Sequence, residues 1–274
     1  MAIITISREL AALGDETARE LAKTLGYRLV DKDAIEARMQ ASGVEAKRFR
    51  KYDERKPSFF AALSNDREDY LHYLRAAVLA EAEQGNCVLV GRGASAILAG
   101  LPAAISVFLS APQEIRVARV KSYFQCDEKR AAQIIARSDR DRAGFHRAFF
   151  DADWKCQGNY SVSLNTGFLG PTDCAEIIAA LKDRLVAGEA EARSAAIVKD
   201  MVLGHRIRHR ILYENELPIR FLEVSVVDGA VALHGATNSA ALLQAAFDAA
   251  REVAPGAEIR NEIQTIREYG ATPG

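Results

Sequence analysis

The sequence predicts an α/β fold with a parallel sheet, followed by a smaller α+β domain. Two observations predict this organisation. Strand-like and helix-like segments alternate along the first two-thirds of the chain, and the composition changes near residue 186, after which the order is αββαβ. Strands that are separated by helices form parallel βαβ units, and such sheets bind ligands at the carboxyl ends of their strands. We therefore expect the chemistry of the first domain, 1–185, at one edge of its sheet.

Each expected element of the first domain follows from its residue pattern. Apolar residues at i, i+3, i+4 and i+7 predict an amphipathic first helix, which carries Ala18, Leu21, Ala22 and Leu25. Short apolar segments are the expected strands, namely Ile3–Ile6, Tyr27–Val30, Cys87–Val90, Ile105–Leu109 and Tyr160–Leu164. The other expected helices are Tyr70–Glu83, Pro112–Lys121, Glu128–Arg142 and Cys174–Leu185.

The smaller domain is expected over 196–270, after a small and polar segment, 186–195, that is typical of a helical linker. Its clearest signal is Asp228-Gly229, a dipeptide that favours the tight turn of a β-hairpin. The elements expected around this turn are a helix at Ile197–Tyr213, strands at Ile219–Val226 and Ala230–His234, a helix at Ser239–Val253 and a strand at Glu258–Ile266.

Composition excludes several classes of protein. The formal net charge is -1, so the overall charge gives no argument for a nucleic-acid partner. The four cysteines are scattered without a Cys-x-x-Cys pair, which indicates reduced thiols and neither a disulfide framework nor a metal site. The chain has neither the pattern of a secretory leader at Met1 nor a long uncharged apolar run. We expect a cytoplasmic protein without a transmembrane segment.

The loop after the first expected strand is the first candidate site. In "ITISRELAALGDETARE" a strand, a loop and a helix follow one another, and the amino end of a helix attracts phosphate. A Walker A loop also needs glycines, a lysine and a hydroxyl residue. Here Gly14 stands in the place of the lysine and Asp15 in that of the hydroxyl residue. From these residues alone, a phosphate site and a plain structural turn are both open.

Two arginine-containing segments are further candidates. Gly91-Arg92-Gly93 follows an apolar strand, and arginine is suited to bidentate contacts with phosphate. Several arginines with interleaved aspartates, in "ARSDRDRAGFHR", can form a mobile lid over phosphates. The alternatives are a solvated arginine at a strand end and a helix stabilised by its own ion pairs.

The order of the motifs "ITISRE", "VLVGRG", "DRDRAGFHRAFF" and "NYSVSLNTG" resembles the cytidylate kinase-like family, a divergent relative of the bacterial CMP kinases. The resemblance covers about residues 1–185. It implies a three-layer P-loop nucleoside-monophosphate-kinase fold with a parallel five-stranded sheet and an arginine-bearing lid. The family loop Ser-Arg-Glu-x-Gly-Ser-Gly-Gly already lacks the Walker lysine. This chain departs from it at Ala11, Ala12 and Leu13.

The resemblance also implies roles for individual residues, with ATP and Mg²⁺ as cofactors. The expected catalytic residues are Arg8, Arg137 and Arg142. The expected phosphate-binding residues are Ser7, Arg8, Gly14, Asp15 and Glu16. The expected acceptor-binding residues are Asp31, Arg92 and Asp139, with an acceptor insert near Ala46–Leu63. Asp15 or Asp31 is the available carboxylate for Mg²⁺.

The smaller domain is similar to a BON domain. The likeness rests on the hairpin "VVDGAVALHG", whose matching residues are Val226, Asp228, Gly229, Val231, Leu233 and Gly235. It implies a ligand or a protein partner for this domain, and self-association of the chain also stays open. Three functions remain: ATP-dependent phosphoryl transfer to CMP or a related small acceptor, an inactive nucleotide-sensing module coupled to the BON-like domain, and an adaptor that binds no nucleotide.

Overall fold

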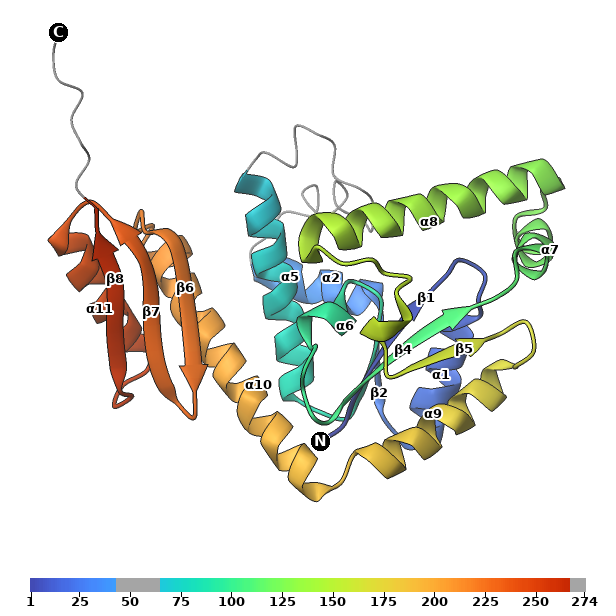
Figure 1. The fold of residues 1–274 in the computed structure, drawn as a ribbon, viewed down its shortest axis with the longest axis horizontal. Helices are drawn as coiled ribbons and strands as arrows, with labels where there is room; N and C mark the ends of the chain where they lie inside the picture. Colours follow the sequence, from blue (N-terminus) through green and yellow to red (C-terminus); the bar gives the residue numbers. More distant parts are fainter. Residues whose placement is uncertain (43–64, 267–274) are drawn as a thin grey trace, which may run out of the picture. The chain divides into compact units, whose positions relative to one another are not determined.

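The computed structural model describes residues 1–42 and 65–266, and the chain divides into two compact units, Met1–Ser194 and Ala195–Gly274 (Figure 1). The expected acceptor insert near Ala46–Leu63 lies outside the described residues. Within the described part, no helix is both long and apolar enough to cross a membrane.

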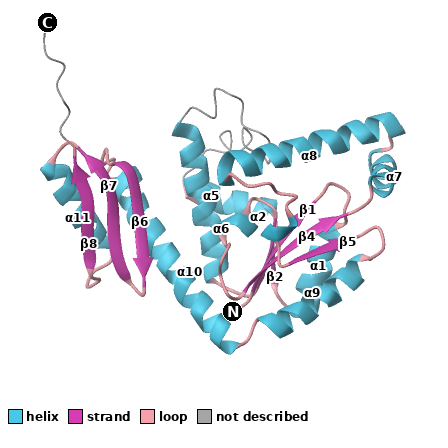
Figure 2. Ribbon diagram, viewed as in Figure 1, coloured by secondary structure: helices cyan, strands magenta, loops and turns pink. Residues whose placement is uncertain are grey.

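A five-stranded sheet forms the centre of the first unit (Figure 2). Its strands are β1 (Ile3–Arg8), β2 (Arg28–Val30), β3 (Cys87–Val90), β4 (Ala104–Ser110) and β5 (Val162–Asn165). The spatial order is β2-β3-β1-β4-β5, and every neighbouring pair is parallel. The predicted parallel five-stranded sheet is confirmed, and β1 occupies its central position.

Helices cover the sheet on both faces and complete three layers (Figure 1). On one face, α1 (Gly14–Leu25) and α9 (Pro171–Leu185) pack on apolar strand residues. The residues of this core include Ile4, Ile6, Leu21, Val88, Ile105, Val107 and Ile178. On the other face, α6 (Ala94–Ile97) packs against β1 and against α5 (Asn65–Glu83).

A helical hairpin extends from the carboxyl end of β4. It consists of α7 (Gln113–Phe124) and α8 (Glu128–Phe150), which pack on each other. The sequence predicted that the second of these helices ends near Arg142, but α8 continues to Phe150. The cause is an apolar extension, because the ring of Phe149 packs at a tilt against that of Tyr70 of α5, at a centroid distance of 5.3 Å. Tertiary packing therefore lengthens the helix.

Two helices were not expected, the four-residue α6 and the longer α2 (Lys32–Ala41). The pattern of α2 is weak. The buried apolar residues of this helix are Ile35 and Met39, a single i,i+4 pair that gives a weak helical pattern. Asp31 caps the helix, since its Oδ1 accepts a hydrogen bond from the Ala34 amide at 3.0 Å. The cap and the ion pair between Lys32 and Glu36 at 3.8 Å support a helix that periodicity alone does not predict.

The second unit has the predicted αββαβ order. It contains α10 (Gly188–His209) from Ala195 onward, which continues as a π-helical turn at Arg210–Glu214. The elements that follow are β6 (Arg220–Val227), β7 (Ala230–Thr237), α11 (Ala240–Val253) and β8 (Ile259–Thr265). β7 is antiparallel to β6 and parallel to β8. The segment expected as a linker forms the first turns of α10, where Ser194 Oγ accepts a hydrogen bond from the Ala103 amide at 2.7 Å.

The β6–β7 hairpin turns at the two residues that the sequence singles out. Asp228 and Gly229 both have positive φ, 50° and 79°, as the favoured two-residue hairpin turn requires. Asp200 of α10 accepts hydrogen bonds from both of their amides, at 2.8 and 3.1 Å. The turn is therefore set by its own residues and also tied to the helix that packs beside it.

Candidate functional site

The loop between β1 and α1 comprises residues 9–13 and holds two unusual backbone conformations. Ala11 and Leu13 have φ of 61° and 53°, in the left-handed region that glycine adopts without strain. These are two of the positions at which the family loop carries glycine. A non-glycine residue costs roughly 1–2 kcal/mol there. The loop therefore adopts left-handed backbone at two residues that do not favour it.

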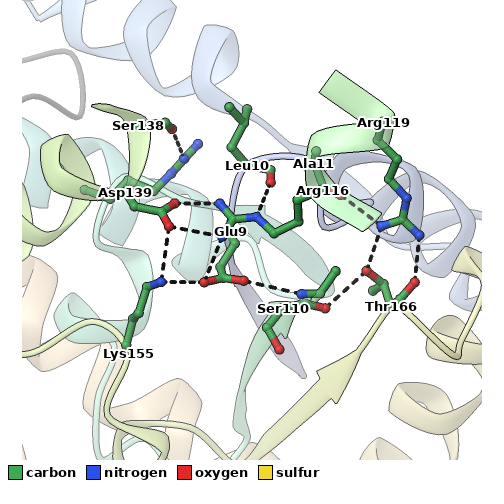
Figure 3. A network of polar contacts seen from close by, with 12 residues as sticks. Glu9, Leu10, Ala11, Ser110, Arg116, Arg119, Ser138, Asp139, Lys155 and Thr166 are labelled. Atoms are coloured by element: carbon green, nitrogen blue, oxygen red, sulfur yellow. Dashed lines mark hydrogen bonds and ion pairs between the residues drawn. The ribbon is translucent and has the colours of Figure 1, made fainter. Parts of the chain in front are cut away.

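Two arginines of α7 hold this loop from outside (Figure 3). The Nε of Arg116 donates to the Leu10 carbonyl at 2.8 Å, and Nη1 of Arg119 donates to the Ala11 carbonyl at 2.9 Å. Arg119 also donates to the carbonyl oxygen of Thr166, just beyond β5, at 2.7 Å. The strained loop is thus fixed to elements that follow β4 and β5 in the sequence.

A four-residue ion-pair network joins the loop to α8 (Figure 3). Arg116 contacts Asp139 through both of its terminal nitrogens, at 3.1 and 2.7 Å, and Glu9 at 3.2 Å. Lys155 donates to Glu9 and lies 3.2 Å from Asp139. Arg116 and Glu9 are almost fully buried, with exposed fractions of 4% and 7%. Two cations balance two carboxylates, which is the condition for burying such a group.

The network shifts the proton affinities of its members. Burial raises the pKa of Asp139, but hydrogen bonds and charges from Arg116 and Lys155 outweigh it, and the net pKa is lowered. Burial lowers the pKa of Lys155, whereas Glu9 and Asp139 raise it, and the net pKa is raised. Both groups are therefore charged at neutral pH, and the loop and α8 stay linked by ion pairs.

A cavity of about 700 Å³ opens between the loop and α8. Arg8 and Leu10 line it from the loop side, and most of the rest of its wall comes from α8. Among the described residues, it is lined by the six cationic side chains of Arg8, Lys32, Arg130, Arg137, Arg140 and Arg142 and by one carboxylate, that of Asp141. A cleft lined by charges of one sign concentrates the field and attracts ligands of the opposite sign. This composition favours an anionic ligand.

The predicted phosphate-binding residues gather at the amino end of α1. The Arg8 side chain passes over Gly14, since a Cβ atom on residue 14 would lie 2.4 Å from its Cγ. Its guanidinium forms an ion pair with Asp15 at 3.2 Å. Ser7 instead lies on the sheet face, where its Oγ is 3.3 Å from that of Ser95, and the Glu16 side chain is exposed. The Arg8 side chain therefore fills the space that a side chain at position 14 would need.

The predicted acceptor-binding residues lie in three different settings. Arg92 is 2% exposed, forms an ion pair with Glu36 of α2 and donates to the Tyr70 hydroxyl at 3.3 Å. Asp31 caps α2, and Asp139 belongs to the ion-pair network. The two predicted lid residues also lie in different settings. Arg137 is exposed, whereas Arg142 donates a hydrogen bond to Ser138. Arg137 and Arg142 both line the cationic cavity.

No group of three His, Cys, Asp or Glu side chains that could hold a metal occurs among residues 1–42 and 65–266. A Mg²⁺ ion that accompanies a nucleotide takes most of its ligands from phosphate oxygens and water, and needs one or two carboxylates. Asp15 fits this requirement, because its exposed side chain lies beside Arg8 at the amino end of α1. Asp31 is less suited, since one of its oxygens already caps α2.

Sequence reasoning missed part of the site. Lys32 and Arg130 line the cavity, and Arg116 and Lys155 complete the buried network, but none was assigned a role. Glu9 was noted only as part of the loop motif. The arginine-rich pattern of α8 is a signal for Arg130. The pairing of Arg116 with residues 9 and 139 had no signal, because it depends on how distant segments pack.

Comparison with known proteins is consistent with this geometry. The cytidylate kinase-like family model matches residues 3–167, and the BON domain model matches residues 199–267. No functionally curated protein matches the sequence significantly. The crystal structure of an uncharacterized protein from Eubacterium ventriosum has a TM-score of 0.53 and 20% identity, and the match covers 67% of this chain and 99% of that one. That similarity shows the fold of the first unit.

Two kinase structures are also similar at lower scores. Shikimate kinase from Bacteroides thetaiotaomicron has a TM-score of 0.41 and 14% identity, over 67% of this chain and 98% of that one. Shikimate kinase from Acinetobacter baumannii, in complex with shikimate, has a TM-score of 0.40 and 17% identity, over 68% of this chain and 96% of that one.

Proposed function

The chain belongs to the cytidylate kinase-like family, and we propose that its first unit transfers the terminal phosphoryl group of ATP to CMP or a related small acceptor. The observation that carries this proposal is the cavity with six cationic side chains and one carboxylate between the β1–α1 loop and α8. Phosphoryl transfer is catalysed mainly by positioning the reactants and neutralising their charge. A cavity of this composition suits both tasks.

We assign the phosphates of the donor nucleotide to the loop and α8. Arg8, at the amino end of α1, takes the role of the absent lysine, and the first amides of α1 add donors for phosphate oxygens. Arg137 and Arg142 line the same cavity from α8. There they neutralise the negative charge that develops on the phosphate oxygens as the bond between the transferred phosphoryl group and ADP breaks. Mg²⁺, when bound, supplies further charge neutralisation on the phosphates, with Asp15 as its protein carboxylate.

We assign the acceptor to the region of Arg92 and Asp31. A guanidinium has five N–H donors, so an acceptor phosphate can share Arg92 with Glu36 and Tyr70. Asp139 stays in this proposal as a residue that ties α8 to the loop, because its two oxygens already bind Arg116. The predicted contact of Asp139 with a nucleoside requires that this pairing opens.

A second candidate function is nucleotide sensing without turnover, coupled to the BON domain. One specific observation favours it. The loop combines the absent lysine with left-handed Ala11 and Leu13, and the Arg8 side chain already covers Gly14 at the amino end of α1. A site of this kind can hold a nucleotide through charge alone and leave its terminal phosphate poorly positioned for transfer.

A turnover assay separates the two functions. We expect ADP release from ATP and Mg²⁺ that depends on one added monophosphate, tested across CMP, UMP, AMP and GMP. Arg137→Ala should lower kcat/KM by about tenfold or more, because a hydrogen bond to a charged group contributes about 1.5–3 kcal/mol. Arg147→Ala is the matched control, since Arg147 is an exposed arginine of α8 outside the cavity.

The outcomes differ clearly. ATP binding without release of ADP under any acceptor supports sensing and contradicts transfer. Equal losses in Arg137→Ala and Arg147→Ala would show that the cavity has no special part in the reaction. Arg92→Ala should raise KM for the acceptor while the affinity for ATP is retained, and an unchanged kcat/KM would contradict the assigned acceptor region.

A further inference from the structure

One face of the central sheet carries hydroxyl groups where a buried parallel sheet is normally apolar. Along β1, Ile4 and Ile6 point into the core with α1 and α9, so Thr5 and Ser7 point to the opposite face. On β4, Ser106 is paired in register with Thr5 and shares its face. Strands that are buried on both sides usually read as near-continuous hydrophobic runs. This departure marks the α6 side of the sheet as a polar environment.

A second cavity, of about 490 Å³, lies on this face. Its volume falls in the range of small-molecule sites, roughly 300–1,000 Å³. Its polar lining consists of hydroxyl, amide and imidazole groups, including Thr5, Ser95, Ser106, Asn159, Tyr160 and Ser161. No Asp, Glu, Lys or Arg is among the described residues that line it, and it shares no lining residue with the cationic cavity. The two cavities therefore suit ligands of different charge.

The Thr5 hydroxyl is the strongest indication that this cavity binds a ligand. Its side chain lines this cavity and is only 2% exposed. Its Oγ1 has no hydrogen-bond partner among the residues that the structure describes. Buried hydroxyl groups are nearly always hydrogen-bonded, because an unmade bond costs free energy. The cavity is the direction from which Thr5 can gain that partner.

Aromatic side chains give the cavity firm walls. Trp154 and Tyr160 line it, and both contact the ring of Phe108 of β4. Trp154 meets that ring edge-to-face at a centroid distance of 5.6 Å, and Tyr160 stacks on it at 5.0 Å. The Tyr160 hydroxyl donates to the Trp154 carbonyl at 2.6 Å, which fixes the segment between α8 and β5. Phe150, at the end of α8, lines the cavity as well. Flat apolar walls with a few polar groups are typical of small-molecule sites.

We propose that this cavity binds an uncharged, polyhydroxylated small molecule, with Thr5 Oγ1 hydrogen-bonded to one of its hydroxyl groups. The Oγ of Ser106 already accepts a hydrogen bond from the Ser161 amide at 3.0 Å, and its second lone pair accepts from another hydroxyl group of the ligand. No lysine or arginine is among the described residues that line the cavity, which disfavours a phosphorylated ligand, since a buried charge without a partner is costly. The shared chemistry is a ring with several hydroxyl groups, which a free sugar and the ribose of a nucleoside both offer. This site is separate from the proposed phosphoryl-transfer site and does not depend on its activity.

Titration of the full chain with ribose, glucose and cytidine, followed by ligand-observed NMR, tests the proposal. We expect saturable binding of at least one of these probes, and the probe that binds distinguishes a free sugar from a nucleoside. Thr5→Val keeps the shape of the side chain and removes its hydroxyl, so it should weaken binding about fivefold or more. Ser106→Ala should weaken it in the same direction.

The matched control is Thr17→Val, a buried threonine of α1 that does not line the cavity. It should leave the affinity unchanged, and Arg137→Ala should do the same, because Arg137 lines the other cavity. Thermal unfolding of each variant verifies that it is folded. Absence of binding by all three probes at millimolar concentration, or equal affinity in wild type, Thr5→Val and Ser106→Ala, would overturn the proposal and leave a water-filled cavity.

Discussion

Two turns in this chain need left-handed backbone, and they obtain it in different ways. The β6–β7 hairpin uses Asp228 and Gly229, residue types that adopt positive φ readily. The β1–α1 loop uses Ala11 and Leu13, which do not. In the hairpin, the local sequence specifies the conformation. In the loop, Arg116 and Arg119 hold the carbonyls of Leu10 and Ala11 in place from α7.

The difference shows where the first unit stores strain. Non-glycine residues in the left-handed region persist when their surroundings over-determine the backbone, and such positions cluster at functional sites. Here the same Arg116 also holds Asp139 of α8. The shape of the β1–α1 loop and the position of the cationic wall of α8 therefore depend on one buried guanidinium.

The largest expected effect comes from removing that guanidinium. Arg116→Ala removes one of the two cations that the described residues place beside the buried Glu9 carboxylate, and it leaves Asp139 without its bidentate partner. Breaking a buried ion pair costs about 3–5 kcal/mol of unfolding free energy. Urea denaturation of the first unit measures the loss. Arg130→Ala is the control, because Arg130 lies on α8 outside the network, and a similar cost for both variants would contradict the assigned role.

Substitutions in the two turns should change the unfolding free energy by a smaller amount and in opposite directions. They test whether the loop, unlike the hairpin, is strained. Ala11→Gly relieves a left-handed alanine and should raise the unfolding free energy of the first unit by about 1 kcal/mol. Gly229→Ala, at φ 79°, should lower that of the second unit by about 1 kcal/mol. Thermal denaturation that resolves the two units is the measurement. Destabilisation by Ala11→Gly would show that the loop is not strained.

The smallest expected effect is the pH dependence of Asp139. Its pKa in the folded chain lies below the usual 3.8, so its contribution to stability is present above that pH and is lost as pH falls through the folded pKa. Asp139→Asn should therefore destabilise the first unit at neutral pH, and its difference from wild type should shrink as the pH is lowered below about 4. Asp33→Asn removes an exposed carboxylate as the control. A difference that stays constant with pH would contradict the assigned ion pair.

The architecture of both units could be predicted because their strands and helices have clear local patterns. The five expected strands pair as one parallel sheet, and the second unit has the expected αββαβ order. The helix α2 was missed because it buries only Ile35 and Met39, and α8 was predicted too short because its last turns depend on contacts with α5. Patterns within one element predict that element, and contacts between elements determine its ends.

The sequence predicted where the candidate site lies in the fold, but it did not predict which of its side chains contact one another. The resemblance led to Arg8, Gly14, Asp15 and the arginines of α8, and the structure brings Arg8, Arg137 and Arg142 to one cavity. The buried pairing of Glu9, Arg116, Asp139 and Lys155 joins residues up to 146 positions apart, and no spacing in the sequence indicates it. The left-handed Ala11 and Leu13 were likewise not predicted, since neither residue type favours that conformation.

Calorimetric titration of ATP and Mg²⁺ into the full chain tests most directly whether the cavity between the β1–α1 loop and α8 is the phosphate site. We predict that Arg137→Ala weakens binding about tenfold or more. Arg147→Ala should leave the dissociation constant of wild type unchanged, and added salt should weaken binding in both wild type and the control. Equal affinity in wild type and Arg137→Ala, or no heat of binding in wild type, would contradict the account.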